Sequence, residues 1–104
     1  MDDRELLELA AKAAGIEVIR VDEPGLWIAG GAGVHWNPLT DDGDALRLAV
    51  KLNFEIERSR LADRAYVGSV GDAPWVEYVN DEQDIYECTR RAIVRAAAEI
   101  GRAM

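Results

Sequence analysis

Residues 35–53, HWNPLTDDGDALRLAVKLN, contain the segment that most constrains the fold. The pattern predicts a helix over 40–52, because apolar residues recur at helical spacing after a polar start. Those apolar residues are Ala45, Leu46, Leu48, Ala49, Val50 and Leu52. A helix that is apolar around most of its circumference is usually covered on more than one side. The sequence therefore predicts that this is the central helix of the fold.

Oxygen-bearing side chains crowd the start of this helix. They are Thr40, Asp41, Asp42 and Asp44. One interpretation is a cation site, but a calcium loop spans about twelve residues and ends in a glutamate, whereas 45–52 is apolar. Helix capping is favoured, with Thr40 or Asp41 accepting from the first free amides and the other carboxylates at the positive end of the dipole. Gly43 costs roughly 0.5–1 kcal/mol relative to alanine, so we expect a close neighbour there, such as Trp36 or a strand.

The segment before this helix has two interpretations. Trp36 and Asn37, beside the glycines of 30–33, could form a platform for a ligand. Alternatively, Trp36 packs back onto the helix as a hydrophobic staple, with Asn37 held extended by Pro38. We favour the staple. His35 is expected in a surface turn, and the glycines do not match a phosphate-binding motif.

The remaining sequence predicts a mixture of helices and strands. Helices are expected over 3–14, closed by Gly15, and over 81–102, capped by Asn80 or Asp81; strands are expected over 16–21, 26–29, 54–57, 65–67 and 75–79, with a type II turn over 22–25. This α-β-β-α-β-β-β-α order is not strictly alternating. We expect one α+β domain, 1–104, with about three helices packed on an antiparallel or mixed sheet of four to five strands.

Composition restricts the classes of function. The net charge is −8, which disfavours nucleic-acid binding because that depends on basic residues neutralising phosphates. No apolar run reaches the roughly 20 residues of a membrane span, and the acidic N-terminus does not resemble a targeting segment. The single cysteine, Cys88, lies on an apolar helical stripe and is expected in the core. We expect a cytoplasmic protein with no membrane partner, no cofactor and no metal site.

The last helix is locally basic. Arg90, Arg91 and Arg95 are typical of a solvated helix face, and they could alternatively bind a phosphate. If the ligand is a nucleotide, Trp36 or Trp75 could stack on its base. The residues assigned to ligand binding are Trp36, Asn37, Trp75, Arg90, Arg91 and Arg95. The acidic first half and basic last helix also suggest a homo-oligomer.

Two segments carry a resemblance to a known family. WNPLTDDGDALRLAVKL (36–52) and TRRAIVRAAAEIGRAM (89–104) resemble the phage ABA sandwich domain, found in small phage and prophage proteins of unknown function. That family is distantly similar to phage anti-Thoeris proteins, which sequester cyclic-ADP-ribose-type signals by binding and form oligomers. The resemblance implies a phage origin and a fold, and it does not extend to 54–80.

The leading expectation is a non-enzymatic phage accessory protein that binds a host-derived ligand, such as a nucleotide signal. The alternative is an acidic protein-interaction or inhibitor module acting on a host protein. A metal-dependent hydrolase using Asp41, Asp42 and Asp44 is disfavoured. The exposure of Trp36 decides between its two interpretations, because an exposed ring supports a ligand platform and a buried ring supports packing.

Overall fold

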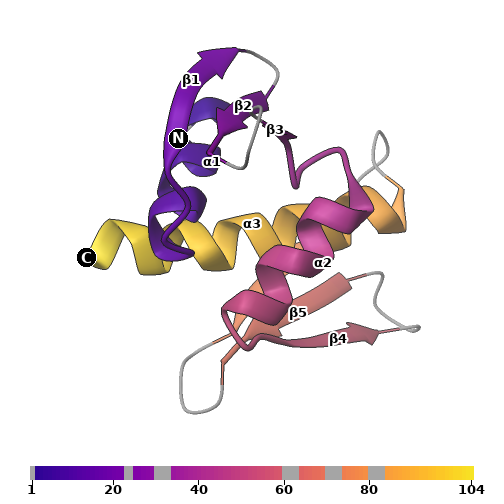
Figure 1. Ribbon diagram of the computed structural model, residues 1–104. Helices are drawn as coiled ribbons and strands as arrows, with labels where there is room; N and C mark the ends of the chain where they lie inside the picture. The colour runs from indigo at the N-terminus through magenta and orange to yellow at the C-terminus, as the bar shows by residue number, and fades with distance from the viewer. Residues whose placement is uncertain (1, 23–24, 30–33, 60–63, 70–73, 80–83) are drawn as a thin grey trace.

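The elements follow one another as three helices and six strands. The computed structural model describes residues 2–22, 25–29, 34–59, 64–69, 74–79 and 84–104. The order is α1 (Asp3–Ala13), β1 (Val18–Asp22), β2 (Gly25–Ile28), β3 (Val34–Trp36), α2 (Asp42–Lys51), β4 (Glu55–Ser59), β5 (Arg64–Gly68), β6 (Trp75–Tyr78) and α3 (Ile85–Ala103). The predicted α+β class is confirmed (Figure 1).

The strands form two antiparallel sheets rather than the one expected sheet. Their orders are β1-β2-β3 and β4-β5-β6, so each sheet is a meander of neighbouring strands on one side of α2 in the chain. The strand β3 was not predicted, and it pairs Trp36 with Leu26 of β2. The glycines of 30–33, and Glu23 and Pro24 of the expected turn, lie outside the described residues. Gly25 was expected at the second central position of that type II turn, but it begins β2 and pairs with Asp22. Figure 1 shows α3 running between the two sheets.

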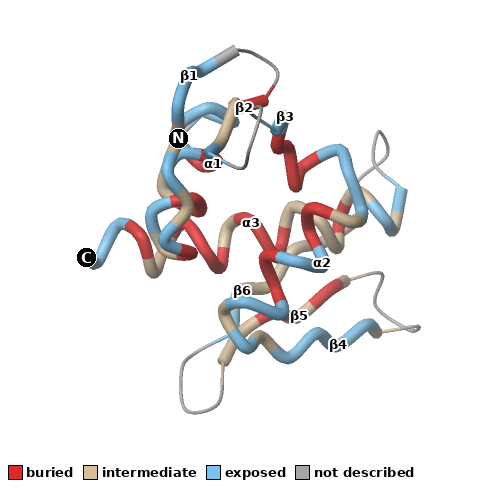
Figure 2. Tube along the Cα trace, in the orientation of Figure 1, coloured by how far each residue is buried: buried red, intermediate tan, exposed pale blue. Residues whose placement is uncertain are grey.

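The central helix is α3, not α2, so that prediction was wrong. α3 packs against α1, α2, β5 and β6. Its buried residues are Cys88, Ala92, Ile93, Val94, Ala96, Ala97, Ala98 and Gly101. Most are small, so neighbouring backbones approach closely from several sides, and Figure 2 shows the buried chain concentrated along α3. In α2, by contrast, Leu46 is 59% exposed and Val50 is 70% exposed. Apolar content alone did not tell which helix would be covered.

The residues at the helix ends were more informative than apolar content. The Asp2 carboxylate accepts from the Glu5 N–H at 2.8 Å and caps α1, and Gly15 follows that helix with φ +68°, as predicted for a residue in the left-handed region. The cap of α3 is Asp84, whose carboxylate accepts from the Glu87 N–H at 2.7 Å. The expected caps further upstream, in 80–83, lie outside the described residues. None of the helices described is long and apolar enough to cross a bilayer.

Candidate functional site

Trp36 and Asn37 lie in the interior. Each is only 4% exposed. The Asn37 N–H donates to the Asp44 carboxylate at 3.0 Å, and the Asn37 side-chain oxygen accepts from the Leu39 N–H at 3.1 Å. These bonds fix the turn that leads into α2. Of the two interpretations, the burial of Trp36 favours packing. The small exposed part of Trp36 lines a pocket of about 260 Å³ together with Ile28 and Leu48.

The aspartates at the start of α2 all bind nearby donors, and Asp41 and Asp44 share Arg47. The Asp41 carboxylate accepts from the Asp44 N–H at 2.8 Å, which confirms Asp41 as the N-cap. Asp44 bonds Arg47 at 2.7 Å and Asp42 bonds Arg90 at 2.6 Å. Across the described part of the chain, no group of three His, Cys, Asp or Glu residues is placed to hold a metal ion. These carboxylates hold the backbone and neighbouring cations.

The close neighbour expected at Gly43 is present, but it is neither Trp36 nor a strand. A Cβ at Gly43 would lie 3.2 Å from the Arg47 guanidinium nitrogens and 3.2 Å from an Asp41 carboxylate oxygen. Both are ends of flexible side chains. The glycine therefore accommodates the ion pairs around the first turn of α2, and no ligand is needed to explain it.

The three arginines assigned to ligand binding do not converge. Arg90 donates from Nε to the Leu39 carbonyl at 2.9 Å and also binds Asp42. Arg91 binds Asp3 of α1 at 3.2 Å, and Arg95 binds Glu77 of β6 at 3.5 Å. Each guanidinium faces a different element and already has a carboxylate partner. This arrangement does not form a phosphate clamp.

Trp75 and Arg95 are the two predicted residues that the fold brings into one cluster, which lies at the edge of the core. The Arg95 guanidinium lies 5.8 Å from the centroid of the Trp75 ring. The Trp75 indole N–H donates to the Glu77 carboxylate at 3.2 Å. Trp75 pairs with Val67 across β5 and β6, and Val67 is fully buried. The pairing places Trp75 on the face of the second sheet that packs against α3.

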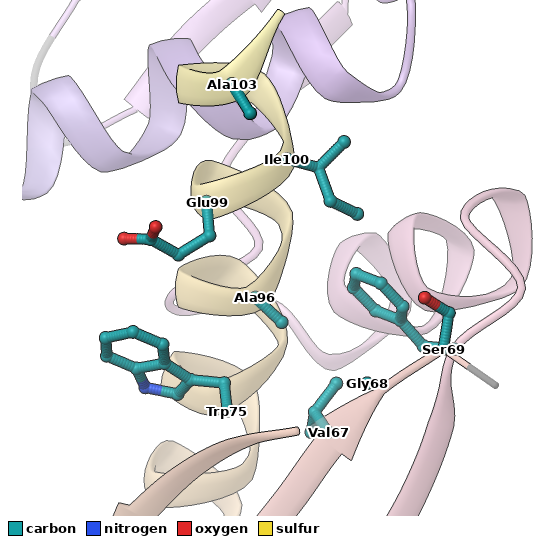
Figure 3. A pocket seen from close by; sticks show the side chains of 9 residues that line it. Val67, Gly68, Ser69, Trp75, Ala96, Glu99, Ile100 and Ala103 are labelled. Carbon is teal, nitrogen blue, oxygen red and sulfur yellow. The ribbon is translucent and has the colours of Figure 1, made fainter. Parts of the chain in front are cut away.

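A pocket of about 250 Å³ lies beside this cluster, between the C-terminal half of α3 and the second sheet (Figure 3). We call it the Trp75 pocket. Its lining residues are Phe54, Val67, Gly68, Ser69, Trp75, Ala96, Glu99, Ile100 and Ala103. Figure 3 shows Ala96 and Ile100 projecting from α3 on the side of Ser69, with Trp75 and Glu99 on the opposite edge of the view. The wall is mainly apolar, and Glu99 supplies its negative charge.

The sequence predicted Trp75 in a binding site but missed the rest of this pocket. Ala96, Glu99, Ile100 and Ala103 recur at helical spacing, which marks one face of a helix. That spacing was available in the sequence, but it was not taken to mark a pocket. Phe54 comes from the segment between α2 and β4, and nothing local indicates that it lies near the end of α3.

A second, larger concave feature lies between α2, β4 and the start of α3. It encloses about 430 Å³, and we call it the α2 groove. Its lining residues are Asp42, Ala45, Leu46, Ile56, Arg58, Ile85, Tyr86, Thr89 and Ile93. Three of the large side chains are well exposed, namely Leu46 at 59%, Ile56 at 40% and Tyr86 at 66%. Clustered exposed apolar side chains of this kind mark interaction surfaces.

Cys88 is buried, as predicted, whereas His35 is exposed as expected but lies on a strand and not in a turn. His35 is exposed on β3 and meets the edge of the Trp27 ring, with 5.4 Å between centroids. Cys88 has no exposed surface. Burial, together with the nearby Glu77 charge, raises the pKa of the Cys88 thiol, so the group stays protonated at neutral pH and is a poor nucleophile.

Comparisons with protein-family models, with curated proteins and with solved structures found no match to this chain.

Proposed function

We propose that this protein is a non-enzymatic binding protein that takes a small organic molecule into the Trp75 pocket. The observation that carries the proposal is an apolar pocket with an aromatic ring and a carboxylate in its wall. Ligand sites are typically concave and apolar with a few polar groups that set orientation. At about 250 Å³, the pocket suits a guest of roughly one ring.

The charges around the pocket favour a guest that is a cation or an amine. Glu99 lines the wall, and its only bond among the described contacts is an exposed pair with Arg102 at 3.0 Å. Exposed pairs of this kind contribute at most about 1 kcal/mol, so Glu99 can turn to a ligand cation. Tryptophan is also the best aromatic partner for a cation, and the Trp75 ring already has the Arg95 guanidinium 5.8 Å from its centroid, so a ligand cation would share the ring with Arg95. A phosphate would meet Glu99 and the chain's net charge of −8 instead of a free arginine.

The resemblance to phage proteins supports a role as a phage accessory factor that captures a host-derived molecule. A nucleotide signal is the less favoured guest, because Arg90, Arg91 and Arg95 already bind carboxylates. Whether a nucleotide binds at all can be tested directly with a nucleotide probe.

The test is calorimetric titration with three probes: benzylamine, benzoate and adenosine monophosphate. We expect benzylamine to bind most tightly, because its ring matches the apolar wall and its ammonium group can reach Glu99. Trp75 fluorescence should change in the same titration. Binding of benzoate or the nucleotide in preference to the amine would contradict the assigned ligand class.

Two matched variants locate the binding. Ala103 lines the pocket at its exposed rim, so Ala103→Phe fills the pocket without disturbing the core. Met104→Phe adds similar bulk to the next residue, which is 66% exposed and does not line the pocket. We expect the first variant to abolish amine binding and the second to retain it. Equal effects of both variants, or no binding by any probe at millimolar concentration, would refute the proposal.

The second candidate function is association with a protein, and a different surface favours it. The α2 groove carries exposed apolar side chains that a small-molecule role does not use. Tyr86→Glu should weaken such an association while leaving amine affinity in the Trp75 pocket unchanged. Affinity capture with the wild type and this variant, alongside calorimetry, would separate the two functions.

A further inference from the structure

The pocket that Trp36 lines separates α2 from the first sheet. It encloses about 260 Å³, and we call it the Trp36 pocket. The close packing of α2 is against α3 and not against the strands of the first sheet, so a space remains beside those strands. The apolar wall of this pocket consists of Ile16, Ile28, Val34, Trp36 and Leu48. None of these residues lines the Trp75 pocket or the α2 groove, so the Trp36 pocket is a separate site.

The apolar wall suits the body of a small organic molecule. Trp36 is 4% exposed and Leu48 is 2% exposed, so these side chains form the floor, whereas Val34, at 48%, borders the mouth. An apolar guest gains affinity when its surface and that of such a wall are removed from water. Drug-sized ligands occupy pockets of about 300–1,000 Å³, so this pocket suits a smaller guest of about six carbon atoms.

One face of α2 supplies the charged part of the pocket. Asp44, Arg47 and Lys51 line it, at the three- and four-residue intervals that put side chains on one side of a helix. Both carboxylate oxygens of Asp44 are already engaged, because one accepts from the Asn37 N–H at 3.0 Å and the other accepts from Arg47 at 2.7 Å. Two cations therefore face one carboxylate, and this wall carries a net positive charge in a chain whose overall charge is −8.

Lys51 supplies the charge that is not neutralised. Within the residues that the structure describes, its ammonium group forms no ion pair. Arg47, four residues earlier, uses a single nitrogen, Nη2, for both of its carboxylate contacts. Like charges four residues apart on one helix repel each other. An anion held between Lys51 and Arg47 would relieve that repulsion.

We propose that the Trp36 pocket binds a small organic acid, with the carboxylate at Arg47 and Lys51 and the apolar body against Trp36 and Leu48. An ammonium and a guanidinium with N–H groups to spare offer donors to both oxygens of a carboxylate. A single negative charge balances the net positive charge of the wall, whereas an amine would add to it. This site goes beyond the proposed amine binding and does not depend on it.

Calorimetric titration with hexanoate and hexan-1-ol tests the ligand class, because these guests share one apolar chain and differ in the charge of the head group. We expect hexanoate to bind about fivefold more tightly than hexan-1-ol, as one exposed ion pair would give. Equal affinities would overturn the role of the cations. Absence of hexanoate binding at millimolar concentration would overturn the site.

The two lysines of the chain provide a matched pair of variants. Lys12 and Lys51 each lie in the last turn of a helix, and only Lys51 lines the pocket. Lys51→Gln should weaken hexanoate binding about fivefold without changing the affinity for hexan-1-ol, and Lys12→Gln should change neither. Nuclear magnetic resonance of the protein carrying ¹³C-dimethylated lysines gives a second readout, in which hexanoate should shift the Lys51 signal and leave the Lys12 signal in place. Equal effects at both lysines would overturn the proposal.

A second pair of variants locates the apolar body. Val34→Phe fills the mouth of the pocket and should abolish hexanoate binding. Val21→Phe is its control, because Val21 is 40% exposed on β1 of the same sheet and does not line the pocket. Circular dichroism and thermal unfolding verify that each variant is folded. Hexanoate binding that is lost in Ala103→Phe and retained in Val34→Phe would place the acid in the Trp75 pocket and overturn this proposal. Hexanoate binding that survives Ala103→Phe supports it, whether or not an amine binds to the Trp75 pocket.

Discussion

Replacing Gly101 with alanine should destabilise the protein, although the same change in most helices is stabilising. Gly101 lies in α3 where α1 crosses it. A Cβ at this position would overlap the Leu9 carbonyl oxygen and lie 2.8 Å from the Leu9 carbonyl carbon. Both atoms belong to the backbone of α1, so they cannot rotate away. The variant can fold only if the two helices move apart along their contact.

The magnitude follows from two opposing terms. Overpacking a core costs about 1–3 kcal/mol, and we take the upper end because the obstructing atoms are backbone. Alanine in place of glycine returns about 1 kcal/mol of helix propensity. The net loss in the free energy of unfolding is therefore about 2 kcal/mol. For a chain of this size, that loss lowers the melting temperature by about 8–16 °C.

Gly43→Ala is the matched control, measured in the same urea and thermal unfolding experiments. A Cβ there meets only the ends of the Arg47 and Asp41 side chains, at 3.2 Å, and these can shift. We expect Gly43→Ala to be neutral or stabilising by up to about 1 kcal/mol. If Gly101→Ala were as stable as the wild type, close backbone contact between α1 and α3 would not be the reason for glycine at this position.

Two further predictions concern buried polar groups. Asp44→Ala removes the acceptor of the buried Asn37 N–H and should cost about 1–3 kcal/mol. Arg47→Ala leaves that bond in place and removes a guanidinium whose side chain is 71% exposed from the half of the pair that faces solvent, so it should cost less than Asp44→Ala; equal losses in urea unfolding would contradict this assignment. Burial raises the pKa of the Cys88 thiol above its ordinary value of 9.0, so above that pH the unfolded state loses a proton that the folded state retains, and the free energy of unfolding falls as pH rises. Cys88→Ala should show a shallower fall over the same range, and identical slopes would refute the link.

The features predicted correctly from the sequence are those fixed by neighbouring residues. The Asp41 cap is an example, since its acceptor and donor are three residues apart. The positive φ angle at Gly15 likewise depends on the identity of that one residue, because glycine has no Cβ. The features missed depend on distant segments: the pairing of β3 with β2, the division into two sheets, and the approach of Phe54 to Trp75 in one pocket. No local pattern encodes these contacts.

The choice of central helix was missed because hydrophobicity was weighed without side-chain size. The large apolar residues of α2 led to the prediction that it is buried, while the many alanines of α3 were not taken as a sign of a central helix. A central helix must let several elements approach it closely, and small side chains permit that, as the contact of Gly101 with Leu9 shows. The assignment of sites suffered in the same way, because arginines were grouped by their spacing in sequence although α3 directs them to α1, α2 and β6.

In contrast to the small buried residues of α3, α2 carries two large apolar side chains, Leu46 and Val50, that are exposed. The buried face of α2 carries Ala45, Leu48 and Ala49, which are each only 2% exposed, whereas Leu46 and Val50 lie outside it. A lysine or glutamate at either position would give a helix of similar propensity or better and would remove little buried area. The folded monomer therefore supplies no reason for leucine and valine there. An apolar surface that the fold does not use acquires a reason only when another surface covers it.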